Sequence, residues 1–144
     1  VKGEALFLLG ASAFKQAKYP QAIERLTQSI AIEPAWTGVD EAYLILAEAY
    51  SKSGDDAQAK STLEQLLSKF PNSPFKTQAQ FRLGQLSASF QQFDAALIAY
   101  DAVLASGDEP DLIDYARYGK AWVLIQKEQF NPAIDLVIDV ARTT

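Results

Sequence analysis

The chain has 144 residues, nearly half of them apolar, a length that suits one domain with its own core. It contains neither cysteine nor histidine, which excludes disulfides, histidine-based catalytic triads and metal sites built on those two residue types. The formal net charge is −5 and no block of lysine or arginine interrupts it, which argues against nucleic-acid binding. The sequence begins with Val1, lacks methionine and has no apolar run long enough to cross a bilayer. We therefore expect the chain to be a fragment of a longer protein. We expect no transmembrane segment within this fragment.

The hydrophobic pattern predicts helices that follow one another in pairs joined by short turns. The expected ranges are 4–16, 20–33, 40–52, 56–69, 77–90, 94–105, 114–127 and 132–141. No alternating run of β-branched residues predicts a strand. An aspartate side chain can accept a hydrogen bond from a free N–H of the first turn, so four aspartates are the expected N-caps: Asp40, Asp55, Asp94 and Asp114.

Small residues recur in two sets, each with a constant spacing of 37 residues. The sets lie in the first and second helix of each pair: Gly10, Ala47, Gly84 and Ala121, then Ala22, Ala59, Ala96 and Ala133. A large residue follows the second set by four positions: Leu26, Leu63, Tyr100 and Val137. Helices approach closely only where side chains are small, so we expect the two small sets to face each other across each hairpin. This contact would explain Gly84, whose place inside a helix costs about 1 kcal/mol relative to alanine.

This pattern resembles the tetratricopeptide-repeat family. Its units carry a leucine and a small residue in the first helix, an aromatic residue in the turn, an alanine in the second helix and a closing proline. The first repeat matches with Leu9, Gly10, Tyr19, Ala22, Leu26 and Pro34, and the second with Leu46, Ala47, Tyr50, Gly54, Ala59, Leu63 and Pro71. The third has Leu83, Gly84, Phe93, Ala96 and Tyr100 with Asp108 in place of the proline; the fourth has Ala121, Phe130, Ala133 and Val137 with Lys120 in place of the leucine.

The resemblance implies an all-α fold, a right-handed superhelical solenoid of about four tetratricopeptide-like helix hairpins. It covers almost the whole sequence, as a single domain over residues 1–144 with repeats at about 3–39, 40–76, 77–113 and 114–144. The long links, and the segment KFPNSPF in particular, resemble bacterial cell-envelope members of the family. That likeness implies the periplasm or cell envelope as the location, with the cytoplasm as the alternative.

The resemblance also implies that a peptide or protein segment docks in a concave groove formed by the first helices. At helical spacing, the residues of that face are Phe7, Ala11, Lys15, Leu44, Glu48, Lys52, Phe81, Gln85, Tyr115, Tyr118 and Trp122. Aromatic rings give a large contact area at low entropic cost, so Tyr115, Tyr118 and Trp122 are the expected hot spot. The alternative is that these rings fill the core between the third and fourth repeats. The opposite face of the first helix, with Leu6, Leu9, Gly10 and Ala13, is expected to be buried.

The last helix, NPAIDLVIDVARTT, is apolar on nearly all sides apart from Asp135 and Asp139. An end helix of a repeat array normally has a polar outer face. We therefore expect a cover over the segment Ile134–Val140, from a further repeat, a partner or a second copy, with no cover as the remaining alternative. Self-association through this helix, or through the N-terminal region around Phe7–Leu9, is thus an alternative function.

The sequence gives little support for catalysis. Asp108, Glu109, Asp111 and Asp114 lie close together in the link SGDEPDLID, but they lack the spacing of an EF-hand loop. A solvated turn is favoured there over a calcium site, and we expect no enzyme, no cofactor and no metal. The leading hypothesis is a non-catalytic scaffold for protein–protein interaction. A regulatory domain of an enzyme that lies outside this sequence is a further alternative.

Overall fold

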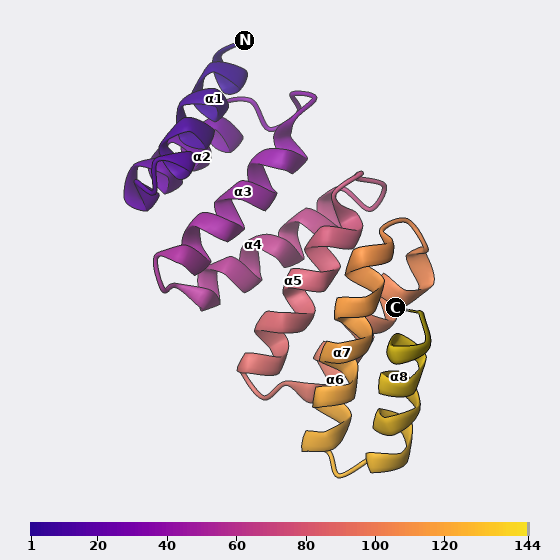
Figure 1. Cartoon of the computed structure of the whole chain (residues 1–144). Helices are drawn as coiled ribbons and strands as arrows, with labels where there is room; N and C mark the ends of the chain where they lie inside the picture. Colours follow the sequence, from indigo (N-terminus) through magenta and orange to yellow (C-terminus); the bar gives the residue numbers. More distant parts are fainter. Residues whose placement is uncertain (144) are drawn as a thin grey trace. The chain divides into compact units, whose positions relative to one another are not determined.

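The computed structural model describes residues 1–143, and in that range it contains helices and no strand (Figure 1). The helices are α1 (Lys2–Lys15), α2 (Tyr19–Ile32), α3 (Val39–Lys52), α4 (Asp56–Lys69), α5 (Lys76–Ser89), α6 (Phe93–Ser106), α7 (Pro110–Gln126) and α8 (Phe130–Thr143). The predicted all-α class is therefore confirmed. All helices begin within two residues of their predicted starts except α7, which begins four residues early at Pro110.

The chain divides into two compact units, each with its own apolar core. The first unit is Val1–Lys76 and the second begins at Thr77. This division coincides with the boundary predicted between the second and third repeats. The single-domain organisation stays a prediction.

In the first unit, α1 and α2 form an antiparallel hairpin, and α3 packs against α2 (Figure 1). Leu26 of α2 is completely buried, in one cluster with Ala42, Leu46 and Ala49 of α3. These three residues of α3 recur at spacings of three and four, so they lie on one helix face. The core of the first unit is therefore built where α3 covers the outer face of the first hairpin.

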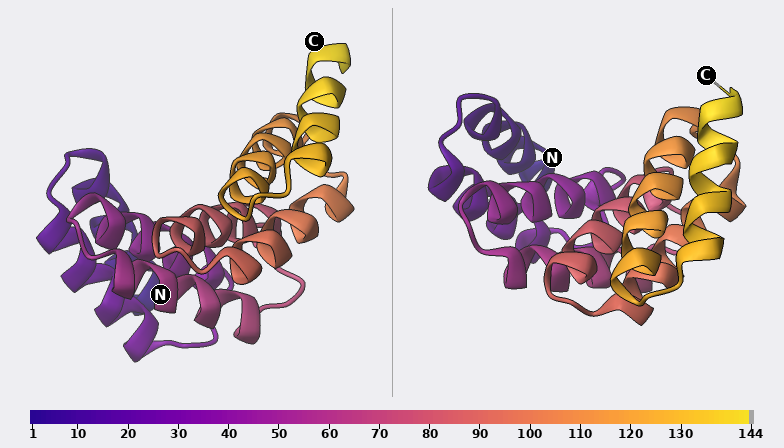
Figure 2. Two further views of the ribbon diagram at one scale, coloured as in Figure 1. Left: turned by 90° about the horizontal axis from the view of Figure 1, so that it is seen from below. Right: turned by 60° about the horizontal axis from the view of Figure 1, so that its bottom comes forward.

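In the second unit, α6 packs against α7, and α7 and α8 lie side by side in Figure 1 and in both views of Figure 2. The buried ring of Tyr100, on α6, lies between two glycines of the neighbouring helices. A Cβ atom added at Gly84 of α5 would lie 2.8 Å from this ring, and one added at Gly119 of α7 would lie 2.6 Å from it. Glycine at both positions gives the phenol ring its space.

The predicted contact between the two sets of small residues holds in the fourth repeat, where Ala121 and Ala133 lie in one core cluster, but the two glycines have a different nearest partner. A Cβ added at Gly10 would meet Leu26 at 2.7 Å, just as one at Gly84 would meet Tyr100. The glycine therefore faces the large residue that follows the alanine by four positions, rather than the alanine itself. The physical reason is volume, because the large side chain projects across the hairpin into the space that the missing side chain leaves.

Asp55 is confirmed as an N-cap, because its carboxylate accepts a hydrogen bond of 3.1 Å from the backbone N–H of Gln58. The other three expected N-caps lie inside their helices: Asp40, Asp94 and Asp114. Helix α7 starts at Pro110 instead, since the fixed φ of proline suits the first turn and its missing N–H costs nothing there.

All four hairpins turn with the same backbone geometry. One residue of each turn lies in the left-handed region with φ between 58° and 89°: Ala17, Gly54, Gln91 and Glu128. These positions are again 37 residues apart. The next N–H then bonds to a carbonyl near the helix end, at 2.9 Å from Lys18 to Ala13 and 2.8 Å from Gln92 to Ser87. This is the closure of a Schellman motif, in which a left-handed residue ends the helix.

Candidate functional site

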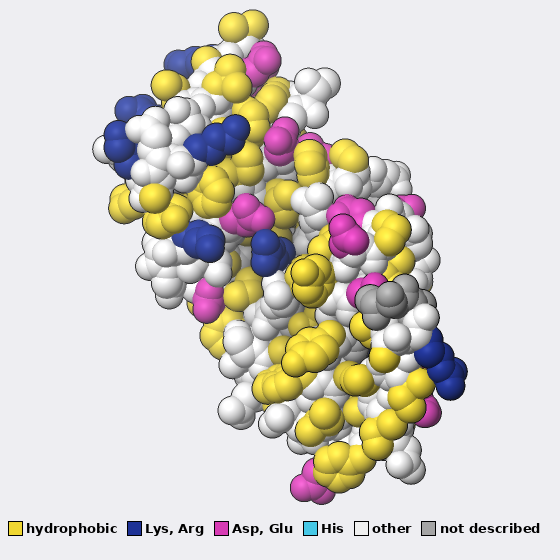
Figure 3. All heavy atoms as spheres, viewed as in Figure 1, with side chains coloured by type: hydrophobic (Ala, Val, Ile, Leu, Met, Phe, Trp, Pro, Cys, Tyr) yellow, Lys and Arg dark blue, Asp and Glu magenta, His cyan; other side chains and the backbone are white. Residues whose placement is uncertain are grey.

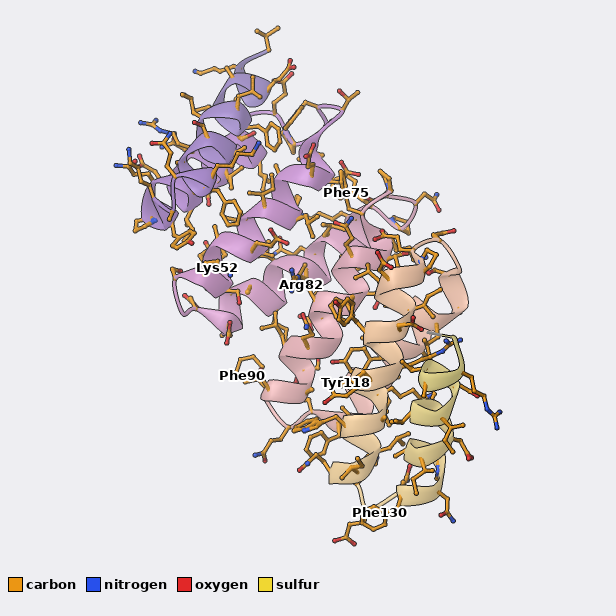
Figure 4. All side chains as sticks on the ribbon, viewed as in Figure 1. Lys52, Phe75, Arg82, Phe90, Tyr118 and Phe130 are labelled. Carbon is orange, nitrogen blue, oxygen red and sulfur yellow. The ribbon has the colours of Figure 1, made fainter. Side chains whose placement is uncertain are left out.

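Helix α7 carries a stripe of exposed large side chains on one face. Its members, called here the α7 stripe, are Tyr115, Tyr118, Trp122 and Ile125, with exposed fractions of 64%, 69%, 44% and 46%. Their alternating spacing of three and four residues keeps them on one side of the helix. Figure 3 shows hydrophobic side chains gathered over α7 and α8, and Figure 4 shows Tyr118 on α7. The predicted aromatic residues are therefore on the surface, and the alternative that they fill the core does not hold for the two tyrosines.

Two rings of the α7 stripe rest against aromatic neighbours in the same unit. The centroids of the Tyr115 and Phe81 rings are 6.4 Å apart, and the Trp122 and Phe93 rings meet edge to face at 6.3 Å. Phe81 also contacts Tyr100, with ring centroids 6.2 Å apart. The exposed rings are thus the outer end of a continuous aromatic cluster, which restricts their rotamers.

On α5, the two predicted site residues have different environments. Phe81 is buried, so it supports Tyr115 from below and presents no surface of its own to a partner. Gln85 is exposed, and its side-chain oxygen accepts a hydrogen bond of 3.1 Å from Arg82. Of this pair, Gln85 is the one that a partner could contact.

In the first unit, the predicted site residues are mostly small, charged or covered. Leu44 is buried, so its expected exposure is wrong; it lies on a helix whose residues are buried on more than one face. Phe7 is half-buried because its ring packs against Trp36 with centroids 5.2 Å apart. The remaining four are half-buried or exposed: Ala11 and Glu48 half-buried, Lys15 and Lys52 exposed.

Sequence reasoning missed two residues that matter here. Ile125 extends the α7 stripe by one turn, and the regular spacing that begins at Tyr115 was a signal for it. Trp36 covers Phe7 from the link between α2 and α3, which no helical periodicity could reveal. The role in binding of all the exposed residues stays a prediction.

Both terminal helices expose apolar side chains. On α1, Leu9 was expected to be buried but is 57% exposed, and its neighbour Leu8 is also exposed. The equivalent residue in α3, Leu46, is buried because α2 covers it, whereas no helix among the described residues covers that face of α1. On α8, four large apolar residues are exposed: Phe130, Ile134, Val137 and Ile138.

Residues 13–77 match the family model of the tetratricopeptide repeat. These residues carry the tetratricopeptide-repeat pattern. Similar solved structures cover nearly the whole chain. MamA is 20% identical, with 97% of this chain and 77% of MamA covered at a TM-score of 0.83. A tetratricopeptide repeat protein from Parabacteroides merdae is 18% identical. The match covers 99% of this chain and 55% of that protein, at a TM-score of 0.84.

Tetratricopeptide-like repeats of a putative kinesin light chain from Podosopora anserina are also 18% identical. The match covers 97% of this chain and 73% of the other, at a TM-score of 0.77. At these identities the similarity shows the fold alone, which is that of tetratricopeptide solenoid proteins. No curated protein sequence matches the chain. The predicted resemblance to the family and the predicted fold class are confirmed.

Tetratricopeptide-repeat proteins are generally non-catalytic scaffolds with protein partners. Within residues 1–143, no group of three acidic side chains is placed to bind a metal ion, and Asp114 pairs with Arg117 at 3.1 Å. Of the described helices, none combines the length and the apolar character needed to cross a bilayer. Burial raises the pKa of the Tyr100 phenol above its usual value, which keeps this ring neutral in the core.

Proposed function

We propose that the chain is a non-catalytic scaffold that binds a segment of a partner protein on its second unit, with the α7 stripe as the main contact. The observation that carries this proposal is the exposure of Tyr115, Tyr118 and Trp122 on successive turns of one helix face. Tyrosine and tryptophan are the residues most enriched among binding hot spots. A contiguous exposed apolar patch of this kind commonly marks an interaction site.

The support under the rings strengthens the proposal. Tyr115 rests on Phe81 and Trp122 meets Phe93, so both rings have lost part of their rotamer freedom before a partner arrives. Binding then costs less side-chain entropy than it would with freely moving side chains. Since the α7 stripe itself carries no charge, it suits a segment that presents apolar side chains at helical spacing.

The other predicted site residues stay part of the proposal within their own units, Gln85 in the second unit and the rest in the first. They are Ala11, Lys15, Glu48, Lys52 and Gln85, which are exposed or half-buried on α1, α3 and α5. Figure 4 shows Lys52 at the end of α3. Leu44 and the half-buried Phe7 act as packing residues in the first unit, and Phe81 does so in the second.

Photo-crosslinking tests the location of the contact. The amino acid p-benzoylphenylalanine is placed at position 118 in the cells that make the protein, and a control chain carries it at Ile98, an exposed apolar position of α6. We expect one discrete cross-linked protein from position 118 and none from position 98. The same products from both positions would contradict the proposal.

A double substitution tests the energetics. Tyr118→Ala with Trp122→Ala should weaken binding of the cross-linked partner about thirtyfold, which corresponds to roughly 2 kcal/mol. Circular dichroism should remain that of the parent, because substitutions of exposed residues usually change stability by less than about 0.5 kcal/mol. A loss of helicity would mean that the two rings hold the fold together, and the assignment as a binding face would fail.

Self-association is the second candidate function. The observation that favours it is the run of exposed apolar residues on α8, which includes Ile134, Val137 and Ile138. Neither candidate depends on the compartment, and the periplasmic or cell-envelope location stays a prediction beside the cytoplasmic alternative.

A further inference from the structure

Helix α8 has two apolar faces, of which one is used within the second unit. The inner face packs against α7 through Ala133 and Leu136, in a cluster with Ala121 and Leu124. The outer face carries Phe130, Ile134, Val137 and Ile138, all exposed. These residues are spaced by four, three and one positions, so they form one stripe along the helix. We call them the α8 stripe.

In the second unit, three of the four equivalent positions of α6 pack against the helix that follows, while Asp101, the equivalent of Ile138, is exposed. One repeat earlier, Phe93, Leu97 and Tyr100 of α6 are the equivalents of Phe130, Ile134 and Val137. Tyr100 belongs to a core cluster with Ala116 and Val123 of α7, and Phe93 and Leu97 pack against that cluster. The α8 stripe thus has the composition of a face that packs on a following first helix.

The first unit repeats this contact between α2 and α3. Ile23, the equivalent of Ile134 three repeats earlier, packs against the cluster that contains Ala42, Leu46 and Ala49 of α3. A second helix therefore donates a large aliphatic residue to a face of the next first helix that has the order small, large, small.

Helix α1 presents this receiving face without a partner among the described residues. Ala5, Leu9 and Ser12 are the equivalents of Ala42, Leu46 and Ala49, and all three are exposed. We call them the α1 face. Beside them lies a hollow of about 370 Å³ between α1 and α2, lined by Leu9, Ser12 and Ala13 together with five polar or charged residues: Gln16, Lys18, Gln21, Glu24 and Arg25.

The hollow lies where the repeat pattern places an incoming side chain. In the second unit, Leu97 packs against Ala121, Leu124 and Ala133. Three repeats earlier these three positions hold Gly10, Ala13 and Ala22, which are smaller or equal in size, and Ala13 lines the hollow. A side chain equivalent to Leu97 therefore has free space beside the apolar side chains of Leu9 and Ala13, with polar and charged side chains on the other side of the hollow.

The two surfaces also differ in the sign of their charge. Residues 1–32 contain four cationic side chains and two acidic ones: Lys2, Lys15, Lys18 and Arg25 against Glu4 and Glu24. Residues 128–142 contain three acidic side chains and one cationic one: Glu128, Asp135 and Asp139 against Arg142. The net charge is thus +2 on the first hairpin and −1 on helix α8 itself, since Glu128 precedes that helix. Opposite signs favour an encounter between these two surfaces over an encounter between like ends.

We infer that the α8 stripe of one copy docks on the α1 face of a second copy, with Ile134 entering the hollow beside Leu9. This inference rests on self-association, the second candidate function. The contact reproduces between two molecules the packing of α6 on α7 and of α2 on α3. Because it joins two different surfaces, the docked pair as a whole keeps one free α8 stripe and one free α1 face, at its two ends.

Two substitutions, each on one surface, test the inference. The parent chain should form species larger than a monomer as its concentration rises from micromolar to millimolar in analytical ultracentrifugation. Leu9→Asp places a charge in the α1 face, and Ile134→Asp places one in the α8 stripe. Both residues are exposed in the monomer. We expect each variant alone to be monomeric at concentrations where the parent associates. A mixture of the two variants should form a one-to-one complex and stop there, because one intact surface of each kind remains.

A matched control distinguishes this contact from nonspecific hydrophobic association. Ile98 is exposed on α6 and is the equivalent of Asp135, so Ile98→Asp adds the same charge outside both surfaces and should leave association unchanged. If either single-surface variant still forms dimers, the contact joins like surfaces and the head-to-tail inference is overturned while self-association stands. A parent chain that stays monomeric overturns both, and leaves the proposed binding by the α7 stripe untouched.

Discussion

At the scale of single residues, Tyr100 and its two glycine neighbours govern the packing of the second unit. We predict that Gly84→Ala destabilises the protein by about 1–2 kcal/mol, although alanine is the better helix former. The reason is the 2.8 Å separation between the added Cβ and the Tyr100 ring, which forces the ring or the helix to move. Urea denaturation measures the loss.

The second repeat supplies a control for this prediction. There the equivalent positions hold Ala47 and Leu63, both buried, so an alanine is compatible with a leucine across the hairpin. Gly84→Ala should therefore cost much less in a Tyr100→Leu background than in the parent. An equal cost in both backgrounds would mean that the ring is not what restricts the glycine.

The burial of Tyr100 also predicts a dependence on alkaline pH. Burial raises the pKa of this phenol above its ordinary value of 10.0, so the unfolded chain loses the proton at a lower pH than the folded chain does. The stability tied to the neutral ring is complete below about pH 10 and is lost as the pH rises further. The parent should lose more stability between about pH 8 and about pH 11 than Tyr100→Phe, as measured by urea midpoints. Identical losses in the two proteins would show that other groups cause the alkaline effect.

At the scale of elements, the left-handed residue of each hairpin turn is the most repeated device of the fold. Three of the four turns place a residue with a side chain there: Ala17, Gln91 and Glu128. A left-handed conformation costs such a residue roughly 1–2 kcal/mol, whereas glycine adopts it freely. We predict that Gln91→Gly stabilises the protein by about 0.5–1 kcal/mol, after the greater entropy of glycine in the unfolded chain is counted.

The fourth turn gives the reverse experiment. Gly54 has a φ of 89°, and an added Cβ would meet nothing within 4 Å, so Gly54→Ala changes only the backbone preference. It should destabilise the protein, with the thermal midpoint falling while that of Gln91→Gly rises. Shifts of the same sign in both variants would contradict the account of the turns.

At the scale of the whole molecule, the repeats make stability local. In a repeat protein each unit contacts mainly its neighbours, so damage need not spread along the chain. We predict that Leu26→Ala costs about 2–5 kcal/mol, because its side chain is completely buried in the first unit. Hydrogen exchange should accelerate in α1, α2 and α3 and change little in α7 and α8. A uniform acceleration would indicate that the chain unfolds as one cooperative body.

The same scale shows what the amino-acid sequence determined by itself. The spacing of 37 residues predicts the hairpins, their number and most helix limits, because helical periodicity and repeat spacing are local properties of the chain. The aromatic residues of α7 were also predicted as a candidate binding face, since three large rings at helical spacing are visible without any tertiary contact. The start of α7 at Pro110, in contrast, was not predicted, because the acidic residues around this proline were interpreted as part of a link.

Tertiary structure alone decided which side of each helix is covered. Leu9 and Leu46 occupy the same position in their repeats, yet one is exposed and the other buried, because burial depends on whether a neighbouring helix lies on that face. Leu44 and Phe81 are buried and Tyr118 is exposed for the same reason. The space for Tyr100 depends on Gly84 and Gly119, which lie on two different helices. Periodicity is a local property of the sequence, whereas burial arises only when separate helices pack together. For this reason the sequence predicted the helices, and only the tertiary structure showed which of their faces are buried.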